Sequence, residues 1–175
     1  MKTSNFFCLF AFLTFSSLGM SLAAQKLETV SVVDLEKYAG KWFEISSFPQ
    51  VFQEGCFCTT AEYTLTKKKI VIVENRCNRG GINGAQTYIK GKAFVKRNSE
   101  NAKLKVQFFW PFKSKYWIID LAADYSFAVV GHPNRKYLWI LSRTPKMDET
   151  IYDTLLTRLQ KNGFDLTKLK KTEQI

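Results

Sequence analysis

The chain has 175 residues, with 26 lysines and arginines against 15 aspartates and glutamates, a net charge of +11, and 15% aromatic residues. This length favours one domain around a single core over two domains. A basic balance suggests anionic partners, but scattered basic residues are most often a solvated surface, and contact with an anionic membrane surface is the functional alternative. The basic residues are scattered and no aromatic–basic RNA signature accompanies them, so we expect no nucleic-acid partner.

Residues 1–23 have the features of a cleavable secretory signal. Lys2 precedes an apolar run from Phe6 to Phe15, and Ser21–Ala23 supplies the small residues that a signal peptidase selects. The run is shorter than the about 20 apolar residues of a membrane-spanning helix. We therefore predict an exported protein whose mature chain covers residues 24–175 as a single domain, with an uncleaved amphipathic anchor as the alternative.

Most of the mature chain has the pattern of short strands. Between Lys103 and Phe108, polar residues alternate with Leu104, Val106 and Phe108, which is the period of a half-buried strand. Eight such segments are expected: Trp42–Phe48, Cys58–Thr66, Lys69–Cys77, Gln86–Lys96, Ala102–Phe109, Lys115–Leu121, Ser126–Gly131 and Tyr137–Arg143. Their short connections predict an all-β fold, an up-and-down barrel or a sandwich.

One segment near the C-terminus has a helical pattern instead. Acidic residues begin it at Asp148, and Gly163 follows its end. An apolar stripe at helical spacing is formed by Ile151, Leu155, Leu156 and Leu159. We predict a helix over residues 148–162 that packs this stripe against the outside of the sheet.

Three cysteines remain after cleavage, Cys56, Cys58 and Cys77, and export makes a disulfide plausible. If Lys67 and Lys68 form a two-residue hairpin loop, Cys58 lies directly opposite Cys77, whereas a slip or bulge presents Cys56 instead. Both pairings stay open, and either leaves one free thiol. A C-x-C spacing with one further cysteine and a single histidine is poor for zinc, so no metal site is expected.

Catalytic and cofactor motifs are absent from the sequence. It contains no G-x-S-x-G elbow, no phosphate-binding loop and no dinucleotide fingerprint. The leftover thiol could act as a nucleophile only if it faced a cavity and its pKa were lowered. We therefore expect no enzymatic activity and no cofactor.

Three stretches, in order, resemble the signatures of the lipocalin family. The G-x-W that opens the first strand in that family matches Gly40, Lys41 and Trp42. The second and third signatures match Asp124 with Tyr125 and, at the end of the last strand, Arg143. The resemblance covers about the whole mature chain and is greatest to the bacterial outer-membrane lipocalins, apolipoprotein D and the plant temperature-induced lipocalins. It implies an eight-stranded antiparallel up-and-down barrel with one C-terminal helix packed outside.

The resemblance also implies a function and a compartment. Members of this group bind fatty acids or lysophospholipids in the barrel and are linked to membrane maintenance under stress. No cysteine stands at the signal cleavage point to carry a lipid anchor, so we expect a periplasmic or secreted protein, free or peripheral to the outer membrane. A monomer or a weak homodimer is expected.

The family also implies roles for particular residues. Its first-strand tryptophan and last-strand arginine close one barrel end, which assigns a structural role to Trp42 and Arg143, with Gly40 beside them. Strand alternation and the family position of Tyr116 predict the cavity residues Leu104, Val106, Phe108, Tyr116, Tyr137, Trp139 and Leu141. Two alternatives come from other classes: a lipocalin-fold enzyme that uses a cavity cysteine, and a filled barrel that serves as an interaction module at the cell envelope.

Overall fold

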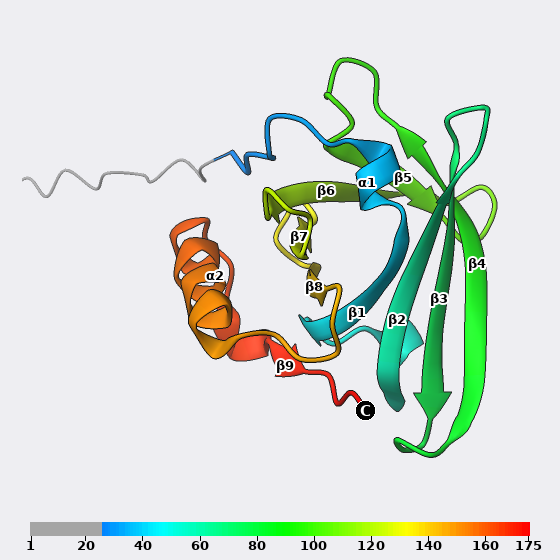
Figure 1. The fold of residues 1–175 in the computed structure, drawn as a ribbon, viewed down its shortest axis with the longest axis vertical. Coiled ribbons are helices and arrows are strands. Elements are labelled where there is room, and N and C mark those ends of the chain that lie inside the picture. The colour runs from blue at the N-terminus through cyan, green and yellow to red at the C-terminus, as the bar shows by residue number, and fades with distance from the viewer. Residues whose placement is uncertain (1–25) are drawn as a thin grey trace, which may run out of the picture.

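The strands form one antiparallel sheet that closes on itself, in a computed structural model that describes residues 26–175. The sheet order is β2-β3-β4-β5-β6-β7-β8-β1-β9, and a further pairing of β2 with β1 closes the barrel. The strands are β1 (Gly40–Ser47), β2 (Cys56–Leu65), β3 (Val71–Arg79), β4 (Ala85–Val95), β5 (Lys103–Gln107), β6 (Ser114–Leu121), β7 (Phe127–Gly131), β8 (Leu138–Ser142) and β9 (Lys170–Lys171). The predicted eight-stranded barrel is confirmed, with one short extra strand (Figure 1). The predicted signal segment lies outside the described residues.

Strand β1 changes partners along its length. Its first residues, Gly40–Phe43, pair with β2, while Ser46 and Ser47 pair with β9. The short strand β9 therefore occupies the edge that β1 exposes where it diverges from β2. Two exposed lysines make up β9, so nothing in the local sequence pattern predicts a strand there.

The hairpin between β2 and β3 differs from the expected one. Its loop is not the two residues Lys67 and Lys68, because the strands end at Leu65 and resume at Val71, which pair with each other. Thr66 closes the longer turn, since its backbone N–H donates to the carbonyl of Ile70 and its hydroxyl donates to the same oxygen. Of the two possibilities left open, the two-residue loop of Lys67 and Lys68 is therefore not the one that forms.

A bulge in β2 then decides the disulfide. The register shifts between Phe57 and Thr60, and Cys58 in the bulge has a left-handed φ of 51°. Cys56 rather than Cys58 reaches Cys77, and these two form the disulfide, with a Cα–Cα distance of 5.4 Å. Cys58 is left as a free thiol.

Strand β5 is shorter than expected because the chain leaves the barrel after Gln107. The predicted strand included Phe109, but that side chain is exposed, as are Trp110 and Phe112 after it. An aromatic run has the composition of a strand, and its exposure here follows from the turn that joins β5 to β6.

Two helices flank the barrel. The short helix α1 (Leu35–Tyr38) precedes β1, and α2 (Glu149–Lys161) begins where the Asp148 side chain accepts hydrogen bonds from two backbone N–H groups. Figure 1 shows α2 outside the barrel beside β7 and β8. Its buried face packs in a cluster with outward residues of the sheet, and this cluster includes Phe48, Val129, Leu138, Ile140, Tyr152, Leu155 and Leu159.

The predicted stripe of α2 is corrected at one position. Ile151 is exposed, and Tyr152 is buried in its place, where its hydroxyl donates to Ser46 Oγ at 3.2 Å. A neighbouring position on a helix points about 100° away, so the stripe is rotated toward the residue that finds a polar partner. Within residues 26–175, no helix has the length and apolar character needed to cross a membrane.

Candidate functional site

One end of the barrel is closed by Trp42 and Arg143. The Trp42 side chain is fully buried, and the guanidinium carbon of Arg143 lies 3.8 Å from its ring centroid. The guanidinium also donates hydrogen bonds to five backbone carbonyls, those of Lys37, Tyr38, Ala39, Lys41 and Tyr125. Because Arg143 stacks on the indole and makes these hydrogen bonds, it has a structural role and closes this end of the barrel.

The other signature residues support the same end. Gly40 has a φ of +92°, a left-handed backbone conformation that favours glycine, and it lies against the Arg143 guanidinium. The Tyr125 hydroxyl accepts a hydrogen bond from the backbone N–H of Asp34 at 2.9 Å. Asp124 accepts one from the N–H of Ser126 at 3.0 Å and so shapes the turn before β7.

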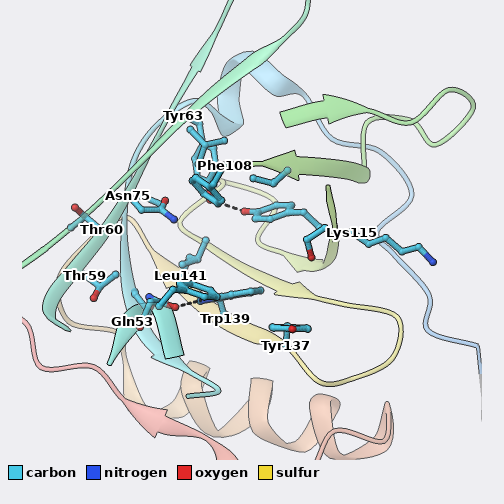
Figure 2. Close-up of a pocket in the computed structure, with 17 residues that line it drawn as sticks. Gln53, Thr59, Thr60, Tyr63, Asn75, Phe108, Lys115, Tyr137, Trp139 and Leu141 are labelled. Carbon is cyan, nitrogen blue, oxygen red and sulfur yellow. Dashed lines mark hydrogen bonds between the residues drawn. The ribbon is translucent and has the colours of Figure 1, made fainter. Parts of the chain in front are cut away.

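A cavity of about 240 Å³ lies in the barrel interior. Six of the seven residues predicted from the sequence line it: Val106, Phe108, Tyr116, Tyr137, Trp139 and Leu141. Figure 2 shows Tyr137, just before β8, and Trp139 and Leu141 on β8 in a row along one side of the cavity. These side chains therefore face the interior as expected, and their role in ligand binding stays a prediction.

Leu104 is the exception and is corrected here. It does not line the cavity, although it is buried in the same core cluster as Trp42 and Val106. Alternation predicts that a side chain faces inward, but the barrel interior contains both the cavity and the packed closed end. Leu104 pairs with Val95 beside the turn between β4 and β5, whereas Val106 lies two residues further along β5 toward the cavity mouth.

The cavity wall includes residues that the sequence analysis did not select: Glu44, Phe52, Gln53, Thr59, Thr60, Ala61, Tyr63, Val73, Asn75, Ser114 and Lys115. A signal existed for Glu44, which shares the face of Trp42 at a spacing of two on β1. No comparable signal existed for the 3₁₀ turn η1 (Val51–Gln53), because its contribution depends on how the β1–β2 connection folds back.

Three tyrosine hydroxyls form a chain beside the inner part of the cavity. Tyr116 bonds to both Tyr38 and Tyr63, with an oxygen–oxygen distance of 2.8 Å in each case. Burial raises the pKa of all three phenols, that of Tyr63 to about 12. All three therefore remain protonated at neutral pH.

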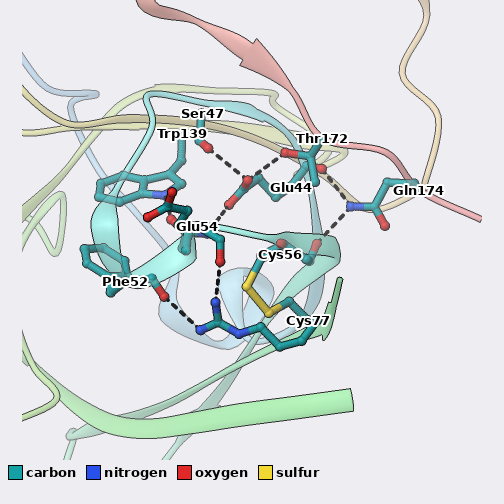
Figure 3. The surroundings of a disulfide bond; sticks show 12 residues. Glu44, Ser47, Phe52, Glu54, Cys56, Cys77, Trp139, Thr172 and Gln174 are labelled. Carbon is teal, nitrogen blue, oxygen red and sulfur yellow. Dashed lines mark hydrogen bonds between the residues drawn. A yellow bond between two sulfur atoms is a disulfide. The ribbon is translucent and has the colours of Figure 1, made fainter. Parts of the chain in front are cut away.

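A buried carboxylate organises the open end. Glu44 accepts hydrogen bonds from the hydroxyls of Ser47 and Thr172 and from the side-chain amide of Gln53. Gln53 in turn accepts one from the indole N–H of Trp139 at 3.2 Å. These bonds join β1, η1, β8 and the C-terminal segment around the cavity entrance, as Figure 3 shows for Glu44, Trp139 and Thr172.

Exposed aromatic and aliphatic side chains surround this entrance. The connection between β5 and β6 carries Phe109, Trp110 and Phe112, and η1 carries Val51 and Phe52; Val51 is 89% and Trp110 86% exposed. The residues flanking both connections line the cavity, so these exposed side chains lie at its mouth. Exposed apolar groups gathered at one place mark an interaction surface.

The free thiol of Cys58 does not belong to the cavity. Cys58 lines a separate pocket with residues such as Lys41, Glu62 and Arg76, and it is absent from the cavity wall. The geometry that the cysteine-enzyme alternative requires is therefore not present among the described residues.

A closed antiparallel barrel, sealed at one end and holding a largely apolar cavity open at the other, defines a container for a small hydrophobic molecule. The family model described as a lipocalin-like domain matches residues 33–174. The chain belongs to the lipocalin family.

Individual relatives agree with this assignment. The chain is 38% identical over 159 residues to temperature-induced lipocalin-1 of Arabidopsis thaliana, covering 86% of this chain and 84% of that protein. It is 34% identical over 151 residues to the outer membrane lipoprotein Blc of Vibrio cholerae, covering 86% and 88%. Among solved structures, insecticyanin of the tobacco hornworm Manduca sexta shares the fold, with a TM-score of 0.70 at 21% identity, covering 87% of this chain and 86% of that one.

The predicted group is confirmed, since apolipoprotein D is among the relatives as well. Membership of the family supports binding or transport of a small hydrophobic ligand, as members are in general binding proteins rather than enzymes.

Proposed function

We propose that the protein binds a single fatty acid or lysophospholipid and carries or stores it in the maintenance of membrane lipids. The observation that carries this proposal is the cavity of about 240 Å³, because Val106, Phe108 and Leu141 on its wall favour an acyl chain. Burial of such a chain contributes about 0.8 kcal/mol for each methylene.

The charged residues of the cavity wall suggest which end of the ligand enters the cavity first. Glu44 and Lys115 are the charged residues of the cavity wall, and Figure 2 shows the Lys115 side chain directed away from the interior. An anionic headgroup buried without a cation is strongly disfavoured. The acyl chain therefore enters first, and the carboxylate or phosphate remains at the mouth near Lys115.

The mouth itself is suited to contact with an anionic membrane surface. Phe109, Trp110 and Phe112 are exposed beside Lys113 and Lys115. Aromatic side chains enter the interfacial layer of a bilayer, and lysines are attracted to anionic headgroups. We propose that the mature chain, residues 24–175, is exported to the periplasm or secreted and collects its ligand at such a surface.

The other two functions have less support. A cysteine-dependent enzyme would need a thiol in the cavity, but the free thiol of Cys58 faces a separate pocket. A filled barrel is at odds with the open volume between Tyr116 and Trp139.

The test uses a fluorescent fatty acid and the variant Trp139→Ala. The indole covers the wall near the mouth, so we expect about tenfold weaker binding with the folded structure retained. The matched control is Trp110→Ala, which removes an exposed indole outside the cavity wall and should leave affinity in free solution unchanged. Unchanged affinity of Trp139→Ala would remove this residue from the binding site.

A further inference from the structure

The inner part of the cavity carries a polar pair on neighbouring strands. Tyr63 on β2 pairs with Val73 on β3, so Asn75, two residues further along β3, is its diagonal neighbour on the same face. Both residues line the cavity, and Figure 2 shows both side chains pointing into it. An acyl chain entering from the mouth would reach them.

The acceptor of this pair has no partner. The side-chain oxygen Oδ1 of Asn75 is buried and accepts no hydrogen bond from the described residues. Buried acceptors without a partner are rare in folded proteins because desolvation is not repaid. The position of this one on the cavity wall points to a bound donor as its partner.

The donor of the pair comes from the tyrosine chain. Three hydroxyl groups, those of Tyr38, Tyr63 and Tyr116, share two hydrogen bonds, so one hydroxyl hydrogen remains without a partner in the chain. The direction of the two bonds can reverse by rotation of the hydroxyls. The remaining hydrogen can therefore lie on any of the three hydroxyls, and on Tyr63 or Tyr116 it belongs to a residue that lines the cavity.

The charges decide which chemical group fits. The oxygens of Glu44 already accept three hydrogen bonds, and Lys115 is exposed and directed outward. A carboxylate at the inner end would be buried without a cation, and a methyl group there would leave Asn75 and the tyrosine unpaired. A neutral hydroxyl group donates one hydrogen bond and accepts another, and so satisfies both.

We infer that the inner end of the cavity binds a hydroxyl group, which donates to Asn75 Oδ1 and accepts from Tyr63 or Tyr116. The inference rests on the proposed function and narrows its ligand to a hydroxyl-bearing lipid. Two sources share this chemistry: a long-chain alcohol, and an acyl chain hydroxylated at its far end, whose carboxylate then lies at the mouth.

The test compares three probes of equal chain length on the purified protein by calorimetry: dodecanoic acid, 12-hydroxydodecanoic acid and 1-dodecanol. We expect the hydroxy acid to bind about fivefold more tightly than dodecanoic acid, the gain typical of one net hydrogen bond. If 1-dodecanol binds as well as the hydroxy acid, the alcohol alone is sufficient. If the hydroxy acid binds more tightly than both, the mouth also recognises its carboxylate. Equal binding of dodecanoic acid and the hydroxy acid would overturn the inference.

Substitutions on the cavity wall test which residues recognise the hydroxyl group. Asn75→Leu removes the acceptor at similar volume and should abolish the preference for the hydroxy acid while dodecanoic acid binds as before or more tightly. Tyr63→Phe should reduce the same preference and serves if Asn75→Leu does not fold. Val106→Ala is the control, because it should weaken both acids by the same factor. A preference that persists in both polar variants contradicts the inference alone, whereas failure of every probe to bind contradicts the proposed function as well.

Discussion

The two ends of the barrel satisfy their polar groups in different ways. At the closed end, Arg143 donates to five backbone carbonyls and covers the buried ring of Trp42. At the open end, Glu44 and Gln53 hold a turn in place while Trp110 and its neighbours remain exposed. We therefore expect that the closed end contributes more to the stability of the fold and that the open end gives the ligand access to the cavity.

The largest expected loss of stability comes from a substitution at the closed end. Arg143→Ala removes the donor to the five carbonyls and uncovers Trp42, and hydrogen bonds to charged groups contribute about 1.5–3 kcal/mol each when taken singly. Because such contributions are not additive, we expect the free energy of unfolding in urea to fall by about 4 kcal/mol.

The control is an arginine on the surface. Arg158 forms an ion pair with Asp120 at 2.9 Å, and Arg158→Ala should cost no more than about 1 kcal/mol. Equal losses in the two variants would contradict the concentration of stability at the closed end.

A smaller effect is expected at the open end, where a covalent bond supports β2 and β3. The disulfide joins Cys56 and Cys77 across 21 residues of sequence, and its removal by paired serine substitutions should cost about 3 kcal/mol. Cys58→Ser, the matched control, should leave the urea midpoint unchanged. A comparable loss from Cys58→Ser would mean that this thiol also supports the fold.

The smallest expected effect on stability concerns the chain of three tyrosines, which lies between the closed end and the open end. Burial raises the pKa of Tyr63 from 10.0 to about 12, so above about pH 10 the unfolded state loses a proton that the folded state keeps. Stability is therefore unaffected by this group below pH 10 and falls as the pH rises toward 12, by up to about 1.4 kcal/mol per pH unit.

Denaturant unfolding at pH 9, 10 and 11 measures this fall. Tyr63→Phe should show a shallower decline than the parent, and Tyr88→Phe, at an exposed ring, should follow the parent. An identical alkaline slope in the parent and Tyr63→Phe would argue against a buried, protonated Tyr63.

The sequence predicted the closed end better than the open end, for a physical reason. The G-x-W around Trp42 and the terminal Arg143 are short motifs whose residues meet wherever the barrel closes. Strand alternation likewise placed Trp139 on the cavity wall, but it could not separate the height of Leu104 from that of Val106 along the barrel axis.

The open end depends on irregular backbone and distant partners. The bulge at Cys58 changes which cysteine faces Cys77, and no local pattern encodes it. The hydrogen bond between Glu44 and Thr172 joins positions 128 residues apart. Such contacts follow from the completed fold, so Glu44 could be placed on the inward face but not assigned its partners.

Native mass spectrometry after mild extraction tests the central claim, a cavity occupied by a lipid, most directly. We expect a second charge-state series whose mass excess matches one fatty acid or lysophospholipid, and we expect this series to disappear on delipidation. Added acyl chains should then restore the excess in the parent and less so in Trp139→Ala. A protein that emerges empty and takes up no acyl chain would contradict the account.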